Sequence, residues 1–173
     1  MPTAQPPTPQ TQSHDFRIEP TRLDAPAHAA ALVALLDHYA TDPMGGGEAL
    51  SERTRQTLVQ RLAQRSDFVS FLAFCGERPV GLINCFEGFS TFAARPLLNV
   101  HDLAVHSDFR GRGVGKLLLA AAEDAARARD CCKLTLEVLS NNTPAIQAYL
   151  RSGFEPYVLD PAAGHAQFMH KWL

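Results

Sequence analysis

The sequence predicts an α+β (mixed α/β) domain organised around one sheet. Segments with the alternating pattern of strands and segments with helical periodicity follow one another along most of the 173 residues. The best-defined strand leads through a glycine-rich turn directly into the best-defined helix. Its 46% hydrophobic and 20% charged residues are typical of a globular protein. We therefore expect residues 15–173 to form a single domain. Residues 1–14, dominated by Pro, Gln and Thr, are expected to form a disordered tail.

The predicted domain begins with a short strand and two helices. Residues 15–19 favour a strand, and residues 25–39 carry three leucines at helical spacing. The run Asp-Pro-Met-Gly-Gly-Gly at 42–47 must break the helix, because Pro disfavours the α region for its predecessor and glycines leave the backbone unrestrained. Residues 51–64 then predict a second helix.

Three strands are expected next. Residues 68–75 and 79–86 are rich in β-forming residues and flank Gly76-Glu77-Arg78. This pattern predicts a hairpin. Residues 97–105 form the third strand of the group.

The clearest helix covers residues 114–129. Glu123 and Arg127 are four residues apart and form an ion pair on its polar side. The predicted apolar stripe consists of Val114, Leu117, Leu118, Ala121, Ala125 and Ala128.

The last part of the chain predicts one more helix between strands. Residues 133–139 alternate as a strand, and residues 143–151 form a short helix with a proline in its first turn and a glycine just past its end. Two closing strands are expected around residues 155–159 and 166–172.

Charge and hydropathy narrow the class of partner. The formal net charge is -2 and the isoelectric point is near 6.4. This balance predicts no binding to nucleic acid or to anionic lipid. No apolar run reaches the roughly 18 residues of a membrane span, and residues 1–14 do not resemble a signal peptide. A small-molecule partner is therefore expected.

The cysteines predict a reduced, cytoplasmic protein without a metal site. None of them has the C-x-x-C spacing of a zinc or redox motif, and two adjacent cysteines rarely form a relaxed disulfide. We expect Cys75, Cys85, Cys131 and Cys132 to have packing roles.

The glycine-rich segment 110–116, Arg-Gly-Arg-Gly-Val-Gly-Lys, lies between the predicted strand and the clearest helix. Such a turn presents unpaired backbone N–H groups at a helix N-terminus, where the dipole favours anions. Glycines keep side chains out of the way of a phosphate, and the two arginines and the lysine add positive charge. The segment predicts binding of a diphosphate or polyphosphate.

Two familiar phosphate loops do not fit this segment. A P-loop would need glycine where Arg110 stands and a hydroxyl residue where Leu117 stands. A dinucleotide-binding G-x-G-x-x-G would need glycine in place of Lys116 and belongs in the first βα unit. A glycine-rich helix start without a ligand remains an alternative.

Two further patterns in correct order give the segment a specific resemblance. Leu103-Ala104-Val105 followed by Arg110-Gly111-Arg112-Gly113-Val114-Gly115 is similar to the Arg/Gln-x-x-Gly-x-Gly/Ala pyrophosphate motif of the GNAT superfamily of acetyltransferases. Asn142-Thr143-Pro144-Ala145, then Tyr149, then Gly153-Phe154 resembles the motif that follows the fifth strand of that family. The resemblance is strong over about residues 100–155.

The resemblance implies a GNAT-type fold, one central mixed sheet of about six to seven strands flanked by about four helices. It also implies acetyl-CoA as acetyl donor, with pantetheine pairing to the splayed backbone of residues 103–105 and the pyrophosphate held by the turn. The cofactor-binding residues implied are Leu103, Ala104, Val105, Arg110, Gly111, Arg112, Gly113, Val114, Gly115, Lys116, Asn142, Ala145 and Tyr149.

Three residues are candidates for acid–base chemistry. Tyr149 matches the position of the family's general acid, which protonates the departing thiolate. His101 and Asp102 precede the cofactor segment and are candidates for the base that takes a proton from the amine. Because strand side chains alternate, we expect these two to point to opposite faces.

The acceptor is expected to be a primary amine of a small molecule. Asp42, between the two early helices, and Glu87, after the second strand of the hairpin, are candidates for attracting an ammonium group. A peptide amine and a non-catalytic acetyl-CoA sensor are the alternatives, and homodimerisation is left open.

Overall fold

The computed structural model describes residues 15–158, 160, 162 and 166–172. The predicted tail over residues 1–14 lies outside them. The elements confirm the α+β class and all four predicted α-helices. In chain order they are β1 (Phe16–Pro20), α1 (Pro26–Ala40), α2 (Glu52–Ala63), β2 (Phe68–Cys75), β3 (Arg78–Ser90), β4 (Arg95–Val105), the 3-10 helix η1 (Ser107–Phe109), α3 (Val114–Ala128), β5 (Leu134–Leu136) and α4 (Thr143–Arg151).

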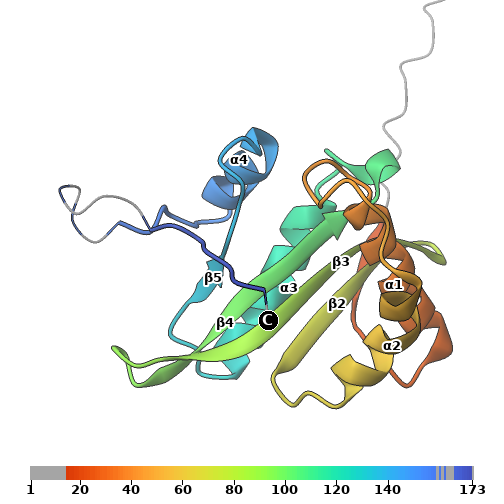
Figure 1. The fold of residues 1–173 in the computed structure, drawn as a ribbon, viewed down its shortest axis with the longest axis horizontal. Coiled ribbons are helices and arrows are strands. Elements are labelled where there is room, and N and C mark those ends of the chain that lie inside the picture. The colour runs from red at the N-terminus through yellow and green to blue at the C-terminus, as the bar shows by residue number, and fades with distance from the viewer. Residues whose placement is uncertain (1–14, 159, 161, 163–165, 173) are drawn as a thin grey trace, which may run out of the picture.

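The strands form one five-stranded sheet in the order β1-β2-β3-β4-β5 (Figure 1). The first four strands are antiparallel neighbours, whereas β5 pairs with β4 in parallel. Parallel neighbours need a long crossover, and α3 provides it. The predicted hairpin around residues 76–78 joins β2 and β3. β3 and β4 are both longer than predicted, since β3 continues to Ser90 and β4 already begins at Arg95.

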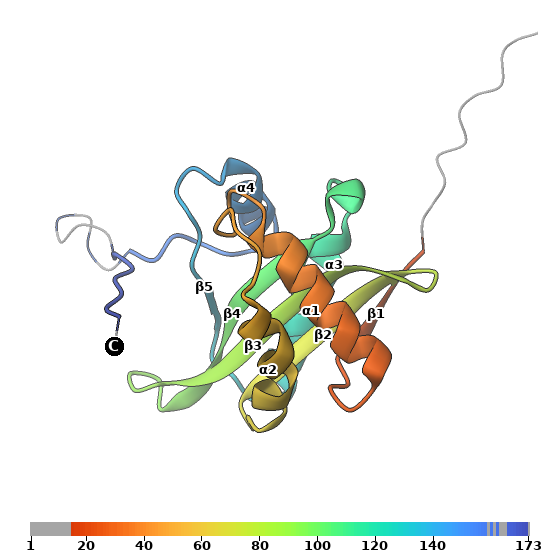
Figure 2. The same ribbon diagram turned by 45° about the vertical axis from the view of Figure 1, so that its right-hand side comes forward.

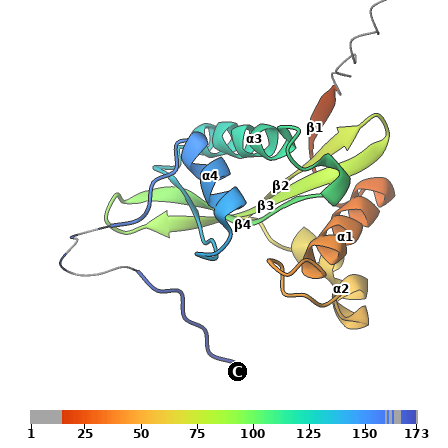
Figure 3. The ribbon, with the colours of Figure 1, turned by 90° about the horizontal axis from the view of Figure 1, so that it is seen from above.

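Helices cover both faces of the sheet. α3 lies on one face and α1 with α2 on the other (Figure 3), and α1 crosses β2 and β3 (Figure 2). No helix among the described residues is long and apolar enough to cross a membrane.

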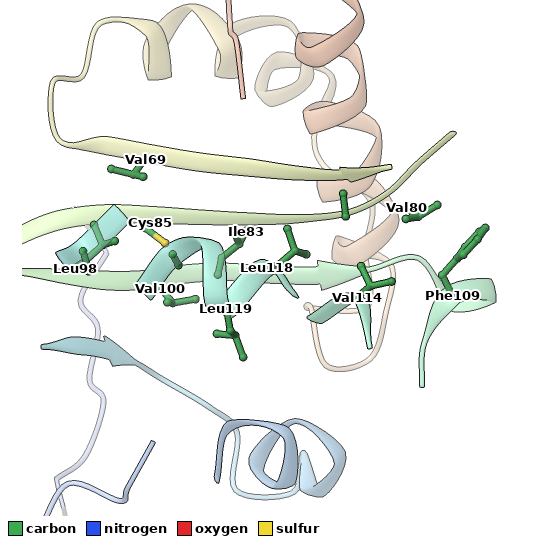
Figure 4. Close-up of a cluster of buried hydrophobic side chains, with 13 residues drawn as sticks. Val69, Val80, Ile83, Cys85, Leu98, Val100, Phe109, Val114, Leu118 and Leu119 are labelled. Carbon is green, nitrogen blue, oxygen red and sulfur yellow. The ribbon is translucent and has the colours of Figure 1, made fainter. Parts of the chain in front are cut away.

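The main core lies between α3 and the sheet, where Leu118 packs with Val80 and Ile83 of β3 (Figure 4). The helix approaches closely here. A Cβ on Gly81 would come within 3.1 Å of both Val114 and Leu118. A side chain at this position would also lie 3.0 Å from the carbonyl oxygen of Ala104, so its neighbours would have to shift to make room. α3 therefore packs closely on β3 and β4.

The apolar stripe predicted for α3 is partly wrong. The buried positions are Val114, Leu118, Leu119, Ala122 and Ala126, whereas Leu117 is 41% exposed. The helix is rotated by about one residue from the predicted orientation, because alanines occur on several of its faces and define its buried face poorly. The ion pair between Glu123 and Arg127 is confirmed.

The two predicted closing strands are not strands in the described part of the chain. Neither residues 155–158 nor residues 166–172 pair with a strand. Phe168, Met169 and Trp172 are 80%, 83% and 88% exposed. An alternating pattern fits a strand, but ladder hydrogen bonds also need a neighbouring strand edge. The described residues thus form five strands where six to seven were expected.

A bulge in β4 separates two parts of that strand. Asn84 of β3 is opposite Asp102, but the next residue, Cys85, is opposite Val100. His101 is therefore the extra residue of a β-bulge. β5 pairs with β4 through Leu98–Val100, so among the described residues β4 has no strand neighbour on its β5 side from the bulge to Val105.

Candidate active site

The glycine turn 110–116 has the backbone of an anion-binding loop. Gly111 and Gly113 have φ values of 74° and 86°, the left-handed region that glycine adopts without strain. Gly113 is the N-cap of α3, whose first turn has neither a side-chain cap nor an acidic residue. Apart from the glycine itself and its two chain neighbours, no atom of the described residues lies within 4 Å of the position of a Cβ on either glycine. The turn thus leaves room for an anion at the positive end of the α3 dipole.

The cations of the turn have different surroundings. The guanidinium of Arg112 lies 5.1 Å from the ring centre of Phe109, and Lys116 is exposed on α3. Arg110 donates to Asp42 Oδ2 at 2.8 Å and to the carbonyl of Val105 at 3.1 Å. Arg110 therefore links the phosphate turn to the loop after α1.

Asp42 and Glu87 do not lie together. Asp42 accepts from the backbone N–H of Met44 at 2.9 Å, and this bond together with Arg110 lowers the pKa of its carboxyl. Glu87 is part of β3 on the face covered by α3, with its carboxylate 3.7 Å from Arg129. Asp42 stays a candidate for the acceptor side, whereas Glu87 faces away from it.

Two histidines stack where α1 meets the end of β4. The rings of His38 and His106 are 4.3 Å apart and nearly parallel. Burial lowers the pKa of His106, and the neighbouring His38, Arg78 and Arg110 lower it further, while Asp108 opposes the shift. Burial beside these groups therefore favours a neutral His106.

This pKa predicts a pH-dependent stability. In the unfolded chain, His106 takes up a proton as the pH falls through about 6.5. In the folded protein, His106 stays neutral to a lower pH, because its pKa is lowered. The stability from neutral His106 is therefore present above about pH 6.5 and is lost as the pH falls towards the lower folded value. We expect the melting temperature to fall less between pH 7 and pH 5.5 in His106→Asn than in the wild type. The exposed His170→Asn is the control, and equal slopes in all three proteins would refute the assignment.

The bulge changes the prediction for His101 and Asp102. Asp102 Oδ2 accepts from Asn84 Nδ2 at 3.0 Å. The rings of His101 and Phe86 are in contact, with their centres 5.4 Å apart. Asn84 and Phe86 are two residues apart on β3 and share a face. Both candidate bases therefore lie on the face of α1 and α2. The expectation of opposite faces is wrong, because the inserted residue interrupts the alternation.

Tyr149 is partly buried beside the core on the α3 face. The centres of its ring and the ring of Phe154 are 5.8 Å apart. Like Leu103 and Val105, Tyr149 packs against the main core between α3 and the sheet. Burial raises the pKa of Tyr149, with a smaller contribution from Tyr39. The hydroxyl thus stays protonated at neutral pH, as a general acid requires.

α4 is held in place by local signals in its sequence. Asn142 is its N-cap and accepts from the backbone N–H of Ala145 at 3.3 Å. Gly153 ends it with a φ of 87°. Asn142 and Ala145, predicted to lie near the pantetheine arm, therefore also fix the start of the helix that carries Tyr149.

Tyr39 is a further candidate site residue, which sequence reasoning missed. It lies in the last turn of α1, and its hydroxyl donates to the carbonyl of Met44 at 3.3 Å. Burial raises its pKa, followed by the negative charges of Asp102 and Asp42. A Cβ on Gly45 would come 2.0 Å from the Tyr39 carbonyl, so the loop closes tightly on this residue. The signal in the sequence was an aromatic residue three positions before the Asp-Pro-Met-Gly-Gly-Gly run at 42–47.

These residues fit the cofactor that the sequence predicted. The left-handed glycine turn can hold a pyrophosphate, and the edge of β4 at residues 103–105, which β5 does not cover, can pair with an amide-bearing arm. The fit comes from the open space around the glycines and from this strand edge, which are neighbouring places on one strand–turn–helix unit.

Comparison with known proteins gives a consistent result. Residues 31–154 match the acetyltransferase (GNAT) family. A streptothricin acetyltransferase from Streptomyces lavendulae is 42% identical over 77 residues, which are 44% of this chain and 41% of that protein. The chain thus spans less than half the length of this relative.

Solved structures resemble the whole fold. A transcriptional regulator from Bacillus halodurans C-125 has a TM-score of 0.73 at 19% identity, covering 91% of this chain and 100% of the other. AAC(6')-Iy in complex with the bisubstrate analog CoA-S-monomethyl-acetylneamine has a TM-score of 0.71 at 17% identity, covering 92% and 99%. At these identities the likeness shows the fold alone. The family match, however, covers more than half of the chain, from α1 to just beyond α4, and this protein belongs to the acetyltransferase (GNAT) family.

Proposed function

We propose that this protein is an N-acetyltransferase that moves the acetyl group of acetyl-CoA directly to a primary amine of a small molecule. One observation carries the proposal. The open glycine turn at the start of α3 and Tyr149 of α4 both adjoin the part of β4 that has no strand neighbour on its β5 side among the described residues. A turn that can bind phosphate, a strand edge that β5 does not cover and a tyrosine hydroxyl that can donate a proton suit an acyl thioester that carries a pyrophosphate.

Each group has a role in this reaction. Acetyl-CoA supplies an activated acetyl thioester when it is bound. Tyr149 donates the proton of its Oη to the departing sulfur. Asp102 and His101 lie on the acceptor face, where a carboxylate attracts the ammonium form of the substrate and a neutral imidazole can take up its proton.

The acceptor is proposed to be a small amine rather than a protein. The name of one similar protein specifies streptothricin, and the structure of AAC(6')-Iy contains a bisubstrate analog with an acetylneamine part. In this protein, the carboxylates of Asp42 and Asp102 lie near Tyr39. We also propose a cytoplasmic location, because Cys85, Cys131 and Cys132 are free thiols, as is usual in a reducing compartment.

The proposal predicts selective stabilisation by acetyl-CoA. A ligand that binds only the folded state at 100 times its Kd adds about 2.7 kcal/mol. For a chain of this size, this is roughly 5 to 10 °C in melting temperature. We expect such a shift with acetyl-CoA and none with ATP or NAD, measured by thermal unfolding. Equal shifts with ATP would contradict the cofactor assignment.

Turnover tests the transfer itself. Release of free thiol from acetyl-CoA is measured with a panel of diamines, amino acids, aminoglycosides and a short peptide. Faster release with a small amine than with the peptide supports the proposal. Stabilisation by acetyl-CoA without release for any amine would instead indicate a sensor, and preference for the peptide would indicate a protein acetyltransferase.

A further inference from the structure

A row of polar side chains crosses the sheet on the face of α1 and α2. Ser70 of β2 is directly opposite Asn84 of β3, which is directly opposite Asp102 of β4. The residue Thr21, just after β1, extends the row, because its backbone N–H donates to the carbonyl of Ser70 at 2.8 Å. The row thus runs from the β1 edge of the sheet to the candidate active site.

Continuous hydrogen bonds join these side chains. Thr21 Oγ1 and Ser70 Oγ are 2.7 Å apart, and Ser70 Oγ donates to Asn84 Oδ1 at 2.8 Å. Asn84 Nδ2 donates to Asp102 Oδ2 at 3.0 Å. Because Ser70 uses its one hydrogen on Asn84, it must accept from Thr21. All donors therefore point towards the carboxylate.

The row is too deeply buried to be an ordinary surface network. Asn84 is 2% exposed and Ser70 is 7% exposed. A polar group at such a site is costly unless it is hydrogen-bonded, and apolar residues can often replace it without loss of stability. Packing alone therefore does not explain why an amide and a hydroxyl occupy these positions.

The neighbouring rows make the contrast clear. On one side, Leu72 of β2 and Leu82 of β3 are opposite each other, and Leu82 is opposite Ala104. On the other side, the rings of Phe68 and Phe86 are in contact. The polar row lies between an apolar row and an aromatic row, and it ends at the one strand that carries the candidate bases.

We propose that Asn84, supported by Ser70 and Thr21, is a positioning residue for Asp102. The amide fixes Oδ2 and stabilises the negative charge of the carboxylate. Oδ1 is then left to meet the acceptor's ammonium group. The inference rests on the proposed acetyl transfer.

The row is not a path for protons. A side-chain amide donates through nitrogen and accepts through oxygen, and it does not pass a proton between them. Asn84 therefore separates Asp102 from the hydroxyls of Ser70 and Thr21. A proton taken from the amine must leave Asp102 or His101 on the solvent side, since His101 is exposed.

The test is a double-mutant cycle between Asn84→Leu and Asp102→Ala. Loss of a hydrogen bond to a charged group should lower kcat/KM for the best amine of the panel about 10- to 100-fold. The stabilisation by acetyl-CoA should not change. In the Asp102→Ala background, Asn84→Leu should have almost no further effect, because the residue it positions is gone. Asn99→Leu is the matched control, since the amide of Asn99 contacts Thr135 and not Asp102.

Each outcome decides the inference. If the wild type is active and the losses of kcat/KM in Asn84→Leu and Asp102→Ala are additive, Asn84 acts independently of Asp102. That result would overturn the positioning role. A wild type without turnover on any amine would overturn the proposed function, and the inference with it. If Asn84→Leu does not fold, Ser70→Ala replaces it in the cycle with a smaller loss of the same kind expected. If the losses of kcat/KM in Ser70→Ala and Asp102→Ala are additive, the positioning role is again refuted.

Discussion

Replacing Gly113 by valine is expected to abolish the stabilisation by acetyl-CoA while the protein still folds. Gly113 has a φ of 86°, and apart from Gly113 and its chain neighbours no atom of the described residues lies within 4 Å of the position of a Cβ there. The valine side chain would therefore occupy the space where the pyrophosphate meets the N-terminus of α3. Loss of two hydrogen bonds to a charged group, about 3 kcal/mol or more, would weaken acetyl-CoA binding roughly 100-fold or more.

The matched control is Gly76→Val in the turn between β2 and β3. Gly76 also has a positive φ, 59°, and open space around its Cβ position. Both variants carry similar left-handed strain, about 1 to 3 kcal/mol against a typical stability of 5 to 15 kcal/mol. Titration calorimetry should show normal acetyl-CoA affinity for Gly76→Val only. Unchanged affinity in Gly113→Val would remove the turn from the cofactor site.

Much of the fold could be predicted because its signals are local. The hairpin around Gly76 has a left-handed glycine at its turn, and α4 begins at an Asn cap followed by proline. The glycine turn before α3 likewise has the predicted strand, turn and helix. Where the backbone conformation depends on neighbours in the sequence, the sequence pattern is sufficient.

The missed features depend on contacts between distant segments. The bulge at His101 depends on how β3 and β4 are aligned, because the register between them shifts by one residue there. Such a shift moves side chains to the other face of the sheet. The ion pair of Arg110 with Asp42 joins residues that are 68 positions apart in the chain. The polar row through Ser70 and Asn84 has the same origin, since single polar residues in three strands have no pattern until the strands are aligned.

The candidate site likewise has residues that the sequence predicted and residues that it did not. The family resemblance located Tyr149 and the glycine turn because they belong to continuous motifs. Tyr39 belongs to no such motif, and only the packing of the loop after α1 brings it near Asp102. Their roles in the reaction remain predictions, which substitution of Tyr149 tests most directly.

Tyr149→Phe is expected to lower kcat about 10²- to 10⁴-fold, the usual range for loss of a general acid. The ring remains, so its contact with Phe154 and the packing of α4 should persist. Acetyl-CoA should therefore stabilise the variant almost as much as the wild type. The control is Tyr157→Phe, which removes a hydroxyl from a side chain that is 62% exposed, and it should retain wild-type turnover.

The dependence on the leaving group separates catalysis from structure. A thiolate of lower pKa leaves with less need for a proton, so the loss in Tyr149→Phe should shrink along a series of acetyl donors with increasingly acidic thiols. A tyrosine that only shaped the site would slow all donors alike. Acetyl thioesters of graded thiol acidity, assayed with the same amine, give this comparison. A wild-type kcat in Tyr149→Phe would mean that water or Tyr39 supplies the proton. The catalytic assignment of Tyr149 would then be withdrawn, while cofactor binding by the glycine turn would stand.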